Sequence, residues 1–286
     1  MTIIAGFSSS RQSAAPLQLA AQVARSTGEK VIAAAIVERA FPPRDDPVER
    51  EYLRYVSAQA QKSLERVVEQ LPADQDIPIV VHQSTSIPTG LMELVEENGA
   101  SLAVVGSSSA GLLGRIGLGS VTERLVHTAA VPVAIAPRGY APGSEPIRML
   151  TAAYGGEADV NGLIPAAAEL ATAWSVPLRI VSFTVRPVGG SIEPTAENLV
   201  VQQWSKRTFD DIVTKLTAVR ERLAVPDVEV VVGSGRDWRE AVEAVPWASG
   251  DILLMGSGAA GPLARVFLGS AASKIVRHVP VPVMIV

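Results

Sequence analysis

The chain has 286 residues, of which 48% are hydrophobic and 19% charged, a globular composition whose length predicts about two domains. The formal net charge of −4 argues against a general nucleic-acid binder, because phosphate contacts need clustered Lys and Arg. Cysteine is absent, which excludes disulfides, thiolate metal sites and a cysteine nucleophile and fits a reducing compartment. No apolar run is long enough to span a bilayer, and the first residues do not resemble a signal peptide. We therefore expect a cytoplasmic protein with no membrane segment.

The first half of the chain alternates short apolar runs with amphipathic segments. The runs are nearly continuous in apolar residues, as in strands that are buried on both faces of a parallel sheet. The predicted strands are residues 2–7, 30–37, 77–82, 101–106 and 131–137, and the predicted helices are residues 14–25, 47–71, 89–98 and 121–129. This order predicts an α/β domain with a five-stranded parallel sheet flanked by helices.

A segment rich in Pro and Gly, residues 137–146, follows and is predicted to be a linker. The second half then repeats the same order. Its predicted strands are residues 149–154, 177–185, 228–233, 251–256 and 281–286, and its helices include residues 164–174, 200–223 and 238–246. We predict two tandem domains, 1–138 and 146–286. The four tryptophans all lie in the second half, where we expect them to pack in the core.

A glycine-punctuated stretch occurs twice, once in each half. Four residues of the first copy recur 150 positions later without a gap, namely Gly106, Gly119, Ser120 and Pro132, which correspond to Gly256, Gly269, Ser270 and Pro282. A fixed long period of this kind is the mark of a repeated unit.

Each glycine stretch begins where a buried strand ends and closes where a helix begins. Ligands of open parallel sheets bind beyond the carboxyl ends of the strands, where glycine lets the backbone approach them. The Gly-Ser pair precedes a helix whose first N–H groups and dipole favour an anion such as phosphate. Arg115 and Arg265, also 150 apart, could supply a cation. The alternative is that Ser120 and Glu123 form a capping box that satisfies the same N–H groups without a ligand.

Two enzyme classes are disfavoured. The run from Gly256 to Gly261 matches the dinucleotide fingerprint G-x-G-x-x-G, but no acidic residue follows Asp251 to hold the ribose. The three histidines do not coincide at the 150-residue offset and have no metal-ligand spacing. We therefore expect a binding or regulatory module rather than an enzyme, with slow incidental nucleotide hydrolysis as the upper limit.

On these motifs the chain resembles a tandem universal stress protein, and the resemblance covers nearly all of it in two copies. The family's nucleotide motif is G, two residues, G, nine residues, G, then S or T. Two departures occur in each copy. The middle glycine is Ser109 in the first copy and Ala259 in the second, and the Asp after the first strand corresponds to Ser8 and Tyr154.

The resemblance implies a Rossmann-like fold of the adenine nucleotide alpha hydrolase type. It also implies binding of ATP or a related adenine nucleotide, with or without Mg²⁺, in one or both domains. The residues implied to contact the nucleotide are Ser8, Val37, Gly106, Ser109, Arg115, Gly119, Ser120 and Val121 in the first copy, and Tyr154, Gly256, Ala259, Arg265, Gly269, Ser270 and Ala271 in the second.

Two questions stay open in the sequence. The first is whether the chain binds nucleotide or is a protein-interaction module of the same fold that has lost this ability. The second is assembly. We expect the two domains to form an intramolecular pseudo-dimer through strands 131–137 and 281–286, because an apolar edge strand invites pairing; the alternative is a homo-oligomer.

Overall fold

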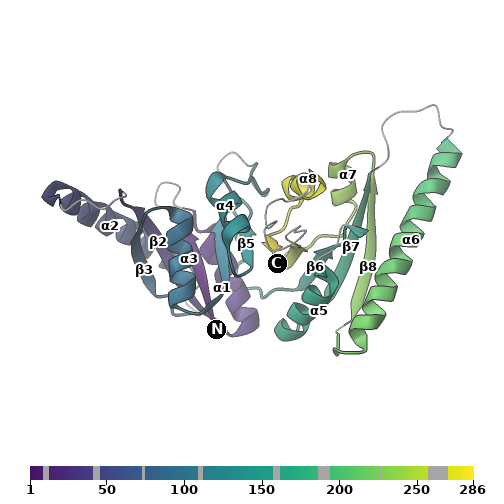
Figure 1. Ribbon diagram of the computed structural model, residues 1–286, viewed down its shortest axis with the longest axis horizontal. Helices are drawn as coiled ribbons and strands as arrows, with labels where there is room; N and C mark the ends of the chain where they lie inside the picture. The colour runs from purple at the N-terminus through teal and green to yellow at the C-terminus, as the bar shows by residue number, and fades with distance from the viewer. Residues whose placement is uncertain are drawn as a thin grey trace. The chain divides into compact units, whose positions relative to one another are not determined.

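The computed structural model describes residues 1–8, 13–40, 46–72, 75–108, 112–156, 162–185, 194–225, 227–256 and 270–286, without the side chains of 194–201. The chain divides into two compact units, Met1–Pro146 and Ile147–Val286 (Figure 1). Each unit is an α/β domain, as the alternating pattern predicted.

Unit 1 is a parallel sheet with strand order β3-β2-β1-β4-β5. Its elements in chain order are β1 (Thr2–Phe7), α1 (Ala15–Thr27), β2 (Lys30–Glu38), α2 (Pro47–Val68), β3 (Ile79–Ser84), α3 (Ile87–Glu97), β4 (Ala100–Gly106), α4 (Ser120–Thr128) and β5 (Val133–Ala136).

Unit 2 repeats this topology, with strand order β10-β9-β6-β7-β8 and every described strand pair parallel. Its elements are β6 (Met149–Ala153), α5 (Leu163–Trp174), β7 (Leu178–Val185), α6 (Pro194–Arg220), β8 (Val228–Gly235), α7 (Trp238–Glu243), β9 (Asp251–Met255), α8 (Ser270–His278) and β10 (Val283–Ile285). Each unit therefore contributes five strands, and the predicted parallel order of strands and helices is confirmed.

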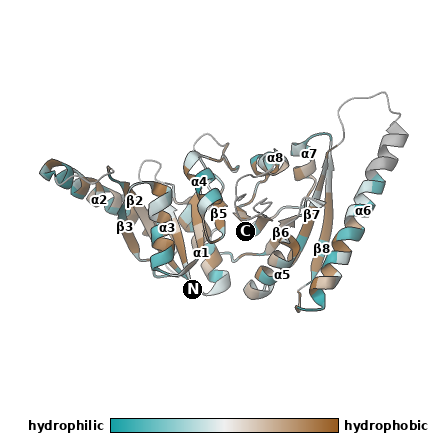
Figure 2. Ribbon diagram, viewed as in Figure 1, coloured by the Kyte–Doolittle hydropathy of each residue, from teal (hydrophilic) through white to brown (hydrophobic). Residues whose placement is uncertain are grey.

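The strands form the core of each unit, and their continuous apolar runs follow from helices covering both faces of the sheet. All four residues of β5 and all five of β9 are buried, and Figure 2 shows the strands as the most hydrophobic elements. Right-handed crossovers place α1 and α2 on one face of the first sheet and α3 and α4 on the other. The strands that follow β1 are added first on one side of it and then, from β4 on, on the other side, so β1 and β4 flank the topological switch point. The topology predicts a ligand crevice outside the carboxyl ends of these two parallel strands.

The segment predicted as a linker, residues 137–146, belongs to unit 1 and lies along α1. The Tyr140 hydroxyl donates to Gln22 Oε1 at 2.6 Å, and Arg25 Nη2 donates to the Gly143 carbonyl at 2.8 Å. Gln22 is fully buried and donates from Nε2 to the Pro146 carbonyl at 3.3 Å. These hydrogen bonds hold the segment on its own unit as far as Pro146.

Candidate functional site

A cavity of about 190 Å³ lies in unit 1 at the carboxyl ends of β1, β2 and β4. One part of its wall is apolar and includes Phe7, Ala34, Ile36, Ile87, Leu91 and Val105. The other part is polar and includes Ser8, Ser13, Ser107, Ser120 and Thr122. An apolar pocket with a few convergent polar groups at a topological switch point is the usual form of a small-molecule site.

Five of the residues predicted from the first glycine stretch and the first strand line this cavity. They are Ser8, Gly106, Gly119, Ser120 and Val121. The fold brings them together because β1 and β4 are neighbours whose carboxyl ends meet, and α4 begins directly above them.

Hydrogen bonds fix the loop between β4 and α4 at its two ends. The Gly117 N–H donates to Ser107 Oγ at 2.7 Å, and the Ser108 N–H donates to the Gly117 carbonyl at 2.7 Å. Thr122 Oγ1 donates to the Gly106 carbonyl at 3.4 Å, which ties the first turn of α4 back to the end of β4. The polar wall of the cavity is therefore held in place without a ligand.

The first turn of α4 does not form the capping box that the sequence suggested. The N-cap residue is Gly119, and Ser120 is the first residue inside the helix, so its hydroxyl is not placed to cap the helix. Among the described residues no side chain caps α4. The first backbone hydrogen bond of the helix runs from the Glu123 N–H to the Gly119 carbonyl at 2.8 Å. The N–H groups of Ser120, Val121 and Thr122 precede it and have no carbonyl partner within the helix, an arrangement that suits an anion.

Three other residues predicted in the first copy have different positions. Val37 is buried on β2, and strand alternation turns it away from the face that carries Ala34 and Ile36. Arg115 donates from its N–H to the Leu112 carbonyl and accepts the Arg138 N–H at 3.2 Å, so its backbone lies beside the end of β5. Ser109 lies outside the described residues.

In the second copy Gly256 follows β9, while Ser270 and Ala271 begin α8. The remaining predicted residues, Ala259, Arg265 and Gly269, lie outside the described part of the chain.

Tyr154 does not correspond to Ser8. Strand register pairs Ala5 with Val104, two residues before Gly106, and Ala152 with Leu254, two residues before Gly256. Tyr154 therefore corresponds to Phe7, and Gly155 occupies the place of Ser8. The Tyr154 hydroxyl donates to Asp211 on α6, and Lys215 Nζ lies 5.5 Å from the centroid of its ring.

The histidines lie away from the cavity lining. His82 Nε2 and Glu93 Oε2 are 2.7 Å apart, and this hydrogen bond is the main reason that the pKa of Glu93 is below its ordinary value. His127 and His278 lie in the last turns of α4 and α8, where a cation suits the helix dipole. The described residues contain no group of three His, Asp or Glu side chains that could hold a metal ion.

The sequence reasoning missed several lining residues, in particular Ile36 on β2 and Ile87 and Leu91 on α3. The period-2 pattern of β2 could have selected Ala34 and Ile36 as one face. The contribution of α3 requires the topology, because α3 follows β3, a strand that contributes no residue to the cavity lining.

The fold and this site define an α/β protein of two tandem doubly wound units, with a cavity at the switch point of the first. The chain belongs to the universal stress protein family, which matches residues 1–137 and 150–286. It is 31% identical to the universal stress proteins Rv2319c of Mycobacterium tuberculosis and Mb2346c of Mycobacterium bovis, over the whole of this chain and 99% of each relative.

Solved structures support the same fold. A universal stress protein from Archaeoglobus fulgidus superposes with a TM-score of 0.56 at 15% identity, covering 99% of this chain and 95% of its own. A putative universal stress protein from Pseudomonas aeruginosa gives 0.58 at 12% identity, covering 100% and 92%. In the described part of the chain, no helix combines the length and the hydropathy that crossing a bilayer requires.

Proposed function

We propose that the chain is a regulatory module of the universal stress protein family that binds an adenine nucleotide in the cavity of unit 1. The observation that carries the proposal is the convergence of Ser8, Gly106, Gly119, Ser120 and Val121 on one cavity. The apolar wall suits a nucleobase, and the open N-terminus of α4 suits a phosphate. The family's nucleotide motif supports the same assignment.

In this function the chain's own residues bind and orient the ligand. Phe7, Ile36 and Ile87 exclude water from the base, and Ser8 offers a hydroxyl at the end of β1. The N–H groups of Ser120 and Val121 would hold the phosphate. We propose no catalytic step, since the lining residues described offer hydroxyl groups and no side chain that is an acid or base at neutral pH.

Unit 2 has weaker support as a site, because Gly155, which has no hydroxyl group, stands in the place of Ser8. We therefore expect one nucleotide per chain. Calorimetric titration of the full chain with adenosine, AMP and ATP tests the proposal. Saturable binding of any of them with a stoichiometry of one supports it, and no binding to the folded chain contradicts it.

The second candidate is a protein-interaction module, and exposed aromatic residues favour it. Tyr52 and Tyr55 on α2 are 62% and 64% exposed, and Trp204 on α6 is 45% exposed. Contrary to expectation, none of the four tryptophans is in the core, because Trp204 is exposed and the other three are only half-buried. Tyr52 precedes the buried Ala60 by eight residues, as Trp204 precedes the buried Ile212, so each of the two helices carries an exposed aromatic ring at the same spacing from a buried residue. Absence of nucleotide binding would favour this candidate.

A further inference from the structure

The cavity of unit 1 is lined by neutral side chains throughout its described part. Its polar wall consists of hydroxyl groups and backbone, and its remaining wall is apolar. Among the described lining residues, attraction for an anion therefore comes from hydroxyl and backbone N–H groups rather than from a cationic side chain.

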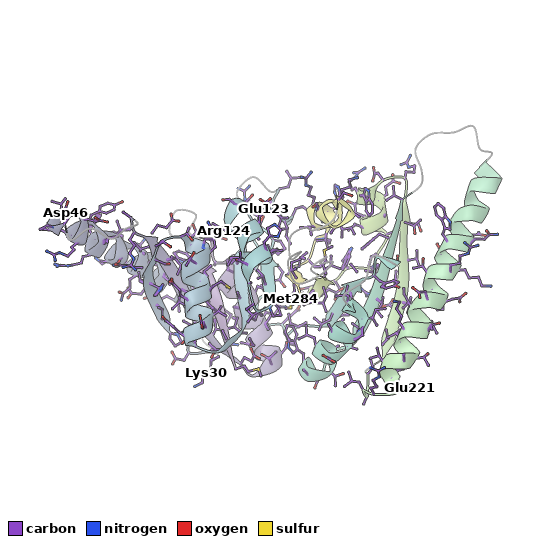
Figure 3. The ribbon with its side chains drawn as sticks, in the orientation of Figure 1. Lys30, Asp46, Glu123, Arg124, Glu221 and Met284 are labelled. Carbon is purple, nitrogen blue, oxygen red and sulfur yellow. The ribbon has the colours of Figure 1, made fainter. Side chains whose placement is uncertain are left out.

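The positive end of α4 is the other source of attraction for an anion. A helix N-terminus is equivalent to roughly half a positive charge. Glu123 lies in the first turn of the same helix (Figure 3) and already places a negative charge there. This carboxylate favours the free helix but repels a ligand that carries several negative charges.

A second carboxylate lies at the apolar end of the cavity. Glu38 Oε1 accepts the N–H of Ile87 at 3.3 Å, and Ile87 is a lining residue. Glu38 and Glu123 belong to different elements, β2 and α4. The described residues contain no cluster of three acidic or histidine side chains that could bind a metal ion. Nucleotide-bound Mg²⁺ is usually held by one or two carboxylates together with the phosphates, and the described lining offers none.

The size of the cavity points in the same direction. At about 190 Å³ it is smaller than the ~300–1,000 Å³ of pockets that enclose drug-sized ligands. A phosphomonoester carries about 1.5 to 2 negative charges at pH 7, and each further phosphate adds to both the charge and the volume.

We propose that the cavity of unit 1 selects an adenine nucleoside with no more than one phosphate over the magnesium complex of the triphosphate. This inference rests on the proposed nucleotide function and specifies its ligand class. The single phosphate lies at the first turn of α4, and Glu123 acts as a positioning residue that discriminates against a polyphosphate.

Calorimetric titration of the full chain with AMP and ATP, each in MgCl₂ and in EDTA, tests this selection. We expect AMP to bind about tenfold or more tightly than ATP, because bringing like charges together at a site disfavours binding. We also expect AMP to bind equally in both buffers. Tighter binding of ATP, or AMP binding that needs Mg²⁺, overturns the inference while leaving nucleotide binding intact. Absence of binding by both ligands, with adenosine also silent, overturns the proposed function and the inference with it.

The variant Glu123→Gln tests the role of the carboxylate. It should raise the affinity for ATP more than the affinity for AMP, since the ligand with more charge gains more from removing the repulsion. Glu97→Gln, on the last turn of α3, is the matched control and should leave the ratio unchanged. An AMP-to-ATP ratio that is the same in Glu123→Gln as in the unmodified chain overturns the assigned role of Glu123.

Discussion

At Gly119 the two ends of the loop between β4 and α4 come into close contact. The backbone there is extended, with φ −115°, a conformation open to any residue. A Cβ atom at this position, however, would lie 3.0 Å from the Cβ of Ser108, which is closer than carbon atoms normally pack. Ser108 is 7% exposed and bonded through its N–H to Gly117. Close approach, rather than a special φ, therefore favours glycine at this position.

The double variant Gly119→Ala with Ser120→Val should abolish nucleotide binding by unit 1. The new methyl group displaces either Ser108 or the start of α4, and the valine removes a hydroxyl from the cavity wall. Calorimetric titration measures the loss, with circular dichroism as the folding control.

Two matched variants accompany this test. Leu112→Ala, at a side chain that is 78% exposed, changes the same loop outside the lining and should bind normally. Gly269→Ala with Ser270→Val makes the same change in the second copy and should not affect unit 1. Full affinity in a folded Gly119→Ala, Ser120→Val protein would show that the phosphate is held elsewhere.

Among the elements, β7 and β9 of unit 2 are joined by a buried ion pair that crosses β6. Asp251, at the start of β9, is fully buried and accepts from Arg179 Nη1 on β7 at 3.2 Å. Its other partners are Arg148 Nε at 3.1 Å and the Ala248 N–H at 3.1 Å. Arg179 is itself buried and also donates to Glu229 on β8 at 2.9 Å. The network thus connects the amino ends of three strands, β7, β8 and β9.

Asp251→Asn should destabilise unit 2 by about 3–5 kcal/mol, because removal of one partner leaves the buried guanidinium of Arg179 poorly compensated. Urea unfolding followed by tryptophan fluorescence measures this selectively, since all four tryptophans lie in unit 2. Glu229→Gln, at a half-exposed partner, is the control and should cost less than about 1 kcal/mol. Equal stabilities of the two variants would contradict this view of the network.

The existence and order of the strands could be predicted from the sequence because each parallel strand is apolar on both faces. The runs ending at Phe7 and Gly106 are examples, and both end at the candidate site. The 150-residue offset also predicted the repeated topology. The convergence of Gly106, Gly119 and Ser120 on one cavity follows from these two signals and the general rule for open parallel sheets.

Features that depend on a shift of one residue could not be predicted in this way. Ser120 is the first residue of α4 rather than its cap, so the spacing to Glu123 has no capping role. Tyr154 corresponds to Phe7 rather than Ser8 because register, which spacing along the chain does not reveal, decides the alignment. Val37 faces away from the cavity for the same reason, since neighbouring residues of a strand point to opposite faces.

For the whole molecule, assembly through the last strand of each unit stays a prediction. Within its own unit β5 is the outermost strand next to β4, and β10 is the outermost strand next to β9. Pro132 and Pro282 precede these strands, where no ladder donor is needed. Apolar strands with unpaired backbone groups favour pairing with another strand.

If the two units pair within one chain, the full protein should sediment as a 30.0 kDa monomer. A fragment of residues 1–146, which ends at the boundary between the units, should then dimerise because its internal partner is missing. Analytical ultracentrifugation of both proteins over a range of concentrations tests this. A fragment that is folded and remains monomeric at high concentration would rule the pairing out, and oligomers of the full chain would favour pairing between chains.

We propose above all that an adenine nucleotide binds at the carboxyl ends of β1 and β4, next to the first turn of α4. Amide NMR spectroscopy of the ¹⁵N-labelled full chain, titrated with AMP, tests it most directly because it reports both binding and place. We expect saturable shifts concentrated at Ser8, Gly106, Ser107, Ser120 and Val121, with β3 and α2 unchanged. Shifts confined to other parts of the chain, or none at saturating AMP, would contradict it.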